Sequence, residues 1–214
     1  MEKLNPKDKR RNTNKMDIID AAERLFFSKG YNNSTMDEVA KEAGFTKRTL
    51  YSYFSSKEEL YEKIKERGYL ILNKLFLEAL EKEKNSSEIL KIKAMGYSFL
   101  KFERDYSGYF KSIFESEGYM VECELLEETT LDMLQKCIRE GVKKGEITNK
   151  IDYVSISLIL WSVLMGFVNT FSRKEEYIKG YFKKDIREVT ENGFDFILNS
   201  IKKDGNWIII FEIL

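Results

Sequence analysis

The stretch from Thr35 to Leu60 constrains the fold of this chain more than any other part of its sequence. Thr35 is followed three residues later by Glu38, a capping box in which each side chain satisfies an unpaired backbone amide at a helix start. Gly44 then supplies a residue for the left-handed conformation in which helices commonly end, and Thr46 suits the N-cap of a second helix. The pattern predicts two short helices joined by a sharp turn.

These two helices, expected near 36–43 and 47–53, each have one apolar face. Leu50 and Phe54 lie four residues apart, so both would pack against the apolar face of the first helix. The polar side chains of the second helix then face outward or flank the core: Lys47, Arg48, Thr49, Tyr51, Ser52 and Tyr53. This arrangement is typical of a helix-turn-helix, whose second helix enters the major groove of DNA.

The outward side chains have the chemistry that DNA contacts require. Lysine and arginine bind phosphates or guanine edges, threonine binds a phosphate or a thymine methyl, and tyrosine hydroxyls bind phosphate oxygens. The spacing leaves open which of Lys47 and Arg48 reads a base and which holds a phosphate. Lys57 opens the next helix, where a cation opposes the helix dipole at a cost of roughly a few tenths of a kcal/mol. We therefore expect a phosphate partner for Lys57.

The run TMDEVAKEAGFTKRTLYSYFSSKEEL resembles the DNA-binding signature of the TetR family of bacterial transcriptional regulators. The resemblance implies an all-α chain of about nine helices and a cytoplasmic homodimer, more often a repressor than an activator, that binds an inverted-repeat operator in double-stranded DNA. It also implies release from DNA by a small effector bound in the C-terminal part. The DNA contacts implied or predicted are Thr35, Thr46, Lys47, Arg48, Thr49, Tyr51, Ser52, Tyr53 and Lys57.

Composition argues against an enzyme. The 214 residues include no histidine, which excludes histidine-dependent triads and histidine metal sites, and no glycine-rich phosphate loop stands out. Cys123 and Cys137, if they share one helix, lie about 21 Å apart, beyond the reach of a disulfide. We expect both thiols to be reduced. We expect no catalytic residue, no metal, no cofactor and no signal peptide. Net charge is zero, but residues 1–57 hold 12 basic against 8 acidic side chains.

Four parts are expected along the chain. They are a flexible basic arm (1–14), a helix-turn-helix domain (15–56), a helical regulatory and dimerisation domain (57–203) and an apolar tail (204–214). The single proline, Pro6, leaves everything after it free to be helical. Caps and turn residues delimit helices near 16–29, 36–43, 47–53, 57–84, 88–104, 107–116, 119–144, 150–172 and 183–203.

Aromatic and sulfur side chains are frequent in the C-terminal half. They are consistent with an adaptable apolar cavity for a small apolar or aromatic effector, although an apolar stripe at helical spacing is more often core. The candidate ligand residues are Phe99, Phe102, Phe110, Met133, Trp161 and Met165. The alternative is a DNA-binding regulator of the same fold that a protein partner controls, with no small-molecule ligand and a filled core.

Tyr153 to Val168 is a strongly apolar run that is too short for a membrane span, so we expect no membrane partner and a helix buried on nearly all sides. Its partners would be the core and a second subunit. A second candidate interface is 186–201, with Val189, Phe194, Ile197 and Leu198. The tail Trp207–Leu214 is strand-prone. It would pack onto the regulatory domain, lie across the dimer, or pair with another chain.

Overall fold

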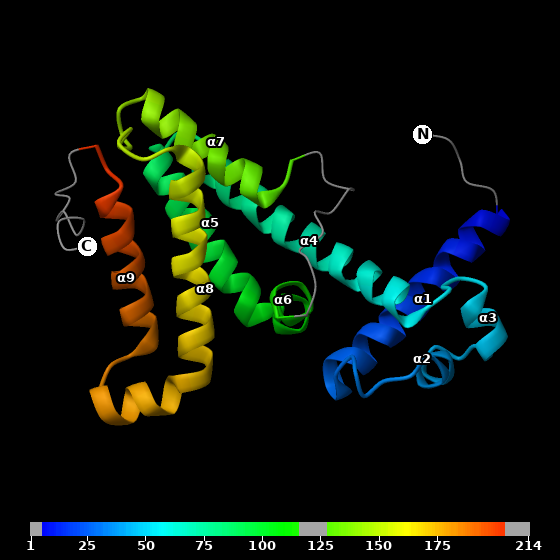
Figure 1. Cartoon of the computed structure of the whole chain (residues 1–214). Coiled ribbons are helices and arrows are strands. Elements are labelled where there is room, and N and C mark those ends of the chain that lie inside the picture. The colour runs from blue at the N-terminus through cyan, green and yellow to red at the C-terminus, as the bar shows by residue number, and fades with distance from the viewer. Residues whose placement is uncertain (1–5, 116–127, 204–214) are drawn as a thin grey trace. The chain divides into compact units, whose positions relative to one another are not determined.

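The computed structural model describes residues 6–115 and 128–203. Within these ranges the chain forms nine α-helices and one π-helical turn, and the lone β pairing there is an isolated antiparallel bridge between Ile147 and Lys202. The all-α prediction is confirmed. The elements (Figure 1) are α1 Pro6–Lys29, α2 Met36–Glu42, α3 Lys47–Tyr51, α4 Lys57–Lys82, α5 Glu88–Asp105, α6 Ser107–Phe114, α7 Thr130–Lys143, α8 Tyr153–Tyr177, η1 Ile178–Phe182 and α9 Ile186–Ser200.

The chain divides into two compact units, 1–69 with 108–121, and 70–107 with 122–214. The expected boundary at residue 56 is therefore misplaced, because the first unit takes in the start of α4 and helix α6. Two glycines make this packing possible. A Cβ on Gly68 would lie 2.8 Å from the Ile113 side chain, and a Cβ on Gly108 would clash with the Phe27 ring. The close approach of α6 to α1 and α4 could not be read from turn signals along the chain.

The start of α1 corrects the prediction of a flexible arm up to residue 14. The helix begins at Pro6, so residues 6–14 are helical. Proline is favoured at the first helical position because its fixed φ suits a helix and its missing amide would have no partner there. The lysines and arginines that follow are good helix formers, which explains why a charged segment with little apolar content still folds as a helix.

The core of the first unit lies between α1, α2, α3 and the start of α4. Fully buried side chains from each helix meet there: Ile18 and Ala22 of α1, Val39 of α2, Leu50 of α3, Phe54, Leu60 and Ile64. The predicted inward positions of Leu50 and Phe54 are confirmed. Their burial removes enough apolar surface from water to stabilise a helix as short as α3, since each such side chain contributes about 1.5–3 kcal/mol.

In the second unit, α5 packs against α7, α8 and α9. Its buried face contains Ile92, Met95, Phe99 and Phe102. A Cβ on Gly96 would clash with the Phe194 ring, so this glycine lets α9 lie directly on α5. The interior of this unit therefore contains large aromatic side chains from both α5 and α9.

Helix α8 differs from its prediction in where it ends. It runs to Tyr177 and continues into η1, with a kink at Lys174, where a turn was expected from residue 172. Within the chain, 28% of its apolar window, Tyr153–Phe171, is buried, and burial of the remainder against a second subunit stays a prediction. That window is long and apolar enough to cross a membrane by length and composition alone. Because one face packs on α5, α7 and α9, its other face is left exposed.

Helix α7 begins later than expected. Thr129 is the N-cap, with its side chain and that of Asp132 forming a capping box, so a helix continuous from residue 119 is wrong at this point. Cys137 on α7 is a buried free thiol, and burial raises its pKa to about 11. Cys123 and the tail 204–214 lie outside the described residues.

Candidate nucleic-acid interface

Local hydrogen bonds set the geometry of the helix-turn-helix. The Thr35 hydroxyl accepts a bond from the Glu38 amide, and the Glu38 carboxylate accepts bonds from the Thr35 amide and hydroxyl, so the predicted capping box is present. Gly44 has a φ of 72°, the left-handed conformation that the turn requires. The Thr46 hydroxyl then accepts from the Thr49 amide at 3.2 Å and caps α3. The turn angle between α2 and α3 therefore follows from three residues and their neighbours.

Leu50 is the buried residue of α3, and its inward position turns the polar side of this helix outward. Lys47, Arg48, Tyr51 and Ser52 are exposed, Thr49 and Tyr53 are half-buried, and Thr35 and Thr46 are exposed at the two N-caps. The structure thus brings eight of the nine predicted DNA contacts to α3 and to the start of α2. A surface with two cations and several hydroxyls on one short helix is suited to phosphates and base edges.

The two cations of α3 differ in their surroundings. The Lys47 ammonium lies 2.8 Å from a carboxylate oxygen of Asp37 on α2, and this hydrogen-bonded pair raises the lysine pKa. Among the described residues, no ion pair involves Arg48. The guanidinium of Arg48 is therefore unpaired by protein carboxylates, whereas the charge of Lys47 is offset by its neighbour.

Three hydroxyls near the turn have intramolecular partners. The Thr46 and Thr49 hydroxyls lie 2.9 Å apart, and the Ser52 hydroxyl donates to the Thr49 carbonyl at 2.6 Å. These bonds hold the side chains of α3 in place before any ligand is bound.

Lys57 occupies a different place from the other predicted contacts. Its ammonium donates to the carbonyls of Tyr31 and Ser34, each at 3.0 Å, and lies 4.2 Å from the Tyr31 ring centroid. The Tyr31 hydroxyl donates to Glu58, and burial together with this carboxylate raises the tyrosine pKa to about 12. Lys57 therefore ties the start of α4 to the connection between α1 and α2, a role that sequence spacing did not indicate.

Two contacts of α1 also support α3. The Asn14 carboxamide donates to the Tyr53 hydroxyl at 3.1 Å, and the Lys15 ammonium lies 5.4 Å from the Phe54 ring centroid. Figure 1 shows α3 beside the N-terminal half of α1. Asn14 was missed by sequence reasoning because it lies 39 residues from Tyr53 and in a segment expected to be flexible.

A polar cluster in the first unit links α1 to α4 and α6. The Arg67 guanidinium donates to Asp20 at 2.6 Å and to Glu23 at 2.7 Å, and the Tyr109 hydroxyl donates to Glu23 at 2.5 Å. Burial lowers the pKa of Arg67, but the hydrogen bonds to Asp20, Tyr109 and Glu23 outweigh it and the net shift is upward. This cluster gives the first unit a second set of contacts that no local motif encodes.

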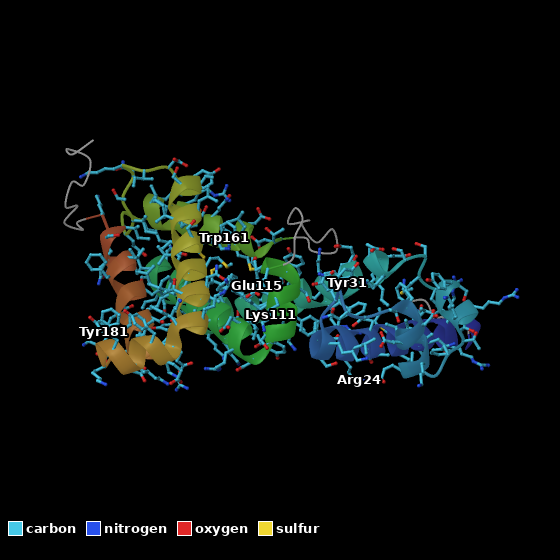
Figure 2. All side chains as sticks on the ribbon, turned by 60° about the horizontal axis from the view of Figure 1, so that its bottom comes forward. Arg24, Tyr31, Lys111, Glu115, Trp161 and Tyr181 are labelled. Atoms are coloured by element: carbon cyan, nitrogen blue, oxygen red, sulfur yellow. The ribbon has the colours of Figure 1, made fainter. Side chains whose placement is uncertain are left out.

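The six candidate ligand residues do not form one group. Phe99, Phe102 and Met133 are buried in the second unit, and Phe110 is buried on α6 in the first unit. Met165 and Trp161, which is labelled in Figure 2, are half-buried on α8. None of the six lines the cavity of about 470 Å³ at the start of α5, whose lining is Ser87, Ile89, Leu90, Gly145, Glu146, Lys202 and Lys203. Among the described residues, no cluster of three histidine, cysteine, aspartate or glutamate side chains could hold a metal ion.

Residues 18–64 match the family model of the bacterial regulatory proteins of the tetR family. The HTH-type transcriptional activator FasR of Mycolicibacterium smegmatis is 35% identical over 118 residues, 55% of this chain and 50% of that protein. The uncharacterized HTH-type regulator YfiR of Bacillus subtilis is 42% identical over 62 residues, 29% of this chain and 28% of that protein. The chain thus matches half or less of the length of these two relatives. The fatty acid metabolism regulator protein of Bacillus subtilis is 24% identical over 87% of this chain and 94% of its own.

Solved structures share the fold. FadR of Bacillus subtilis, solved with stearoyl-CoA, has a TM-score of 0.66 at 20% identity over 87% of this chain and 98% of its own. The complex of SmeT with triclosan has a TM-score of 0.64 at 18% identity over 90% and 93%. The DNA-binding domain of this chain therefore belongs to the TetR family of bacterial regulatory proteins, and the chain has the all-helical fold of the solved structures that it resembles.

Proposed function

We propose that this protein is a transcriptional regulator that binds double-stranded DNA through α3. The observation that carries the proposal is the capped, outward-facing α3, on which Lys47, Arg48, Tyr51 and Ser52 are exposed within a domain of the TetR family. Such a helix presents its N-terminal side chains to base edges in the major groove. A regulator of transcription acts on bacterial DNA, so its place of action is the cytoplasm.

Within this proposal Arg48 reads a base and Lys47 holds a phosphate. A bidentate arginine contact to guanine requires a guanidinium that is free to leave solvent, and no described carboxylate pairs with Arg48. Lys47 must first leave Asp37, which costs part of its binding free energy. A lysine bound to a phosphate gains affinity without sequence preference, and it tolerates this competition better than a base-reading residue would.

The active form is a homodimer that binds an inverted repeat. Two recognition helices related by a two-fold axis reach successive major grooves about 34–36 Å apart. Support comes from the apolar side chains that α8 and α9 leave exposed, among them Leu158 at 47% and Phe196 at 69%. Exposed apolar surface on adjacent helices is typical of a subunit interface.

The proposed regulation is release from DNA, as a repressor, by a small apolar or aromatic effector bound in the second unit. FadR was solved with stearoyl-CoA and SmeT with triclosan, and both ligands have large apolar parts. The alternative is control by a protein partner without a small ligand, in which the buried side chains of Phe99, Phe102 and Met133 would serve only as core.

Selection of bound duplexes from a random DNA pool tests the proposal. We expect an enriched inverted repeat bound by an even number of subunits. No enrichment at moderate salt would refute DNA reading by this form of the protein. A thermal-shift screen of acyl-CoAs and aromatic compounds then separates the two modes of control, because a ligand that binds the folded state raises its melting temperature by linkage, whereas a filled core gives no shift.

A further inference from the structure

Tyrosine hydroxyls in the first unit take part in hydrogen bonds of two kinds. The hydroxyls of Tyr31 and Tyr109 each donate their proton to a glutamate carboxylate. At Tyr53 the direction is reversed, since the carboxamide nitrogen of Asn14 donates to the hydroxyl oxygen at 3.1 Å. Among the hydrogen bonds of the described residues, none takes up the Tyr53 proton. This hydroxyl is therefore left with a proton to donate.

The position of Asn14 follows from the packing of α1. Asn14 precedes Ile18 by four residues, and Ile18 is fully buried in the core of the first unit, so both side chains lie on the same side of the helix. The next residue, Lys15, has its ammonium 5.4 Å from the Phe54 ring centroid. Two successive side chains of α1 thus contact Tyr53 and Phe54, the residues that follow α3 and its C-cap.

Tyr53 is also tied to α3. Its backbone amide donates to the carbonyl of Leu50 at 2.9 Å, and Leu50 is the buried residue of that helix. Tyr53 as a whole is half-buried. The backbone of this residue is therefore fixed by α3, and its hydroxyl oxygen is fixed by α1.

The direction of the bond from Asn14 decides what the Tyr53 hydroxyl can bind. A phenolic hydroxyl has one proton and can also accept hydrogen bonds, and the Asn14 carboxamide occupies an accepting position, so the proton points away from it. Donation into an oxygen also polarises its O–H bond and strengthens the bond that the proton forms. The phosphate oxygens of the DNA backbone accept hydrogen bonds, and tyrosine is among the side chains that donate to them. Asn14 therefore prepares the Tyr53 hydroxyl for an acceptor of this kind.

We propose that Asn14 is a positioning residue for DNA binding. By donating to the Tyr53 oxygen, it directs the hydroxyl proton of Tyr53 to a backbone phosphate of the duplex that α3 enters. The inference rests on the proposed function, and it gives Asn14 a role that involves no contact of its own with DNA. Because the hydroxyl is held before DNA arrives, its ordering adds little to the entropic cost of binding.

A double-mutant cycle tests whether Asn14 acts through Tyr53. The variants are N14A, Y53F and N14A/Y53F, and the operator is the sequence that the wild-type protein selects. Fluorescence anisotropy measures the operator affinity of each protein, and urea denaturation measures its free energy of unfolding. We expect Y53F to weaken operator binding about tenfold and N14A about threefold. The double variant should bind as Y53F does, because without the hydroxyl Asn14 has nothing to direct.

A second substitution, Asn14→Asp, reverses the hydrogen bond. A carboxylate accepts and cannot donate, so it would take the Tyr53 proton and leave none for a phosphate. N12D is the matched control, because Asn12 is an exposed asparagine on the same helix and the added charge is equal. We expect N14D to weaken operator binding more than N12D does. In the Y53F background, N14D and N12D should have equal effects.

Operator affinity at the wild-type level in N14A, or in Y53F, overturns the proposal. A loss in N14A that is equally large in the Y53F background also overturns it, because Asn14 would then act independently of Tyr53. A lower free energy of unfolding in N14A with unchanged operator affinity would leave Asn14 a structural role only and likewise overturns it. If the wild-type protein itself selects no sequence, the proposed function fails first, and the two failures are thus distinguished.

Discussion

The ammonium of Lys57, in the first turn of α4, lies 3.0 Å from the carbonyl oxygen of Ser34, which belongs to the connection between α1 and α2. The same ammonium donates to the Tyr31 carbonyl. From the sequence, this cation opposes the helix dipole, and a phosphate partner explains its placement better than helix stability does. In the structure, the partial negative charges of the two carbonyl oxygens stabilise the ammonium within the protein.

The first prediction follows for Lys57→Ala. Loss of the two charged hydrogen bonds leaves both carbonyls without this donor, so we expect the free energy of unfolding to fall by about 1–3 kcal/mol. Urea denaturation measures it, with Lys82→Ala as the control on an exposed lysine of the same helix. An unchanged midpoint with a salt slope of DNA binding lowered by about 1 would mean that Lys57 serves DNA alone.

The second prediction separates Arg48 from Lys47. Arg48→Ala should weaken operator binding by about 1–3 kcal/mol and relax the preference at one base pair. Lys47→Ala should weaken binding to all sequences about equally. Asp37→Ala frees Lys47 and removes a negative charge beside the DNA, so it should tighten binding to operator and random duplexes alike. Fluorescence anisotropy measures the affinity of each of the three variants for the operator and for a random duplex. A loss of base preference in Lys47→Ala alone would reverse the roles assigned to Lys47 and Arg48.

The third prediction concerns the exposed faces of α8 and α9. A carboxylate at Leu158 or Phe196 would be buried without a partner in a dimer, so Leu158→Asp and Phe196→Asp should give monomers in light scattering after size exclusion. Leu77→Asp, a change at an exposed leucine of α4, is the control and should leave the dimer intact. Dimers in both test variants would move the interface away from these two helices.

The fourth prediction is a pH dependence centred on Glu88. Burial of this carboxyl raises its pKa, but the hydrogen bonds from Lys144 and Lys91 outweigh burial, and the net shift is downward. A lowered pKa in the folded state means that the stabilisation is complete above the unfolded value, about 4.3, and is lost as the pH falls through the folded value.

Glu88→Gln removes this contribution. We expect the variant to be less stable than wild type by roughly 1–3 kcal/mol at pH 7, with the difference shrinking below about pH 4. Chemical denaturation between pH 3 and pH 7 measures it. Glu115→Gln, at an exposed carboxylate of the first unit, should follow the wild-type curve throughout (Figure 2). A constant difference at all pH values would show that the pair with the lysines is not the source.

The fifth prediction concerns Tyr109, whose hydroxyl donates to Glu23 across α6 and α1. Tyr109→Phe keeps the ring against Phe27 but removes the donor, so we expect a loss of about 0.5–1.5 kcal/mol in unfolding free energy. Tyr106→Phe is a matched change on a half-buried tyrosine in the same part of the chain and should cost less. Equal losses in both variants would assign the effect to the ring environment instead of the bond to Glu23.

Local signals in the sequence determined most of the helix-turn-helix. The capping box of Thr35, the left-handed Gly44 and the N-cap Thr46 act through neighbours within three residues, so their structure can be read from the chain alone. The apolar positions Leu50 and Phe54 obey helical periodicity, and this is why the outward set on α3 was predicted correctly. The same reasoning gave an all-helical chain.

Only the tertiary structure decided which residues meet across long separations. Hydrogen bonds join Asn14 to Tyr53 across 39 residues and Lys57 to Ser34 across 23 residues. Another joins Tyr109 to Glu23 across 86 residues. Hydrogen bonds of this kind depend on how the helices pack, and no local pattern encodes the packing. Apolar periodicity likewise marked α8 and α9 as helices that pack against the core or a second subunit, but it does not distinguish a face covered by the chain itself from one left exposed, as at Leu158 and Phe196.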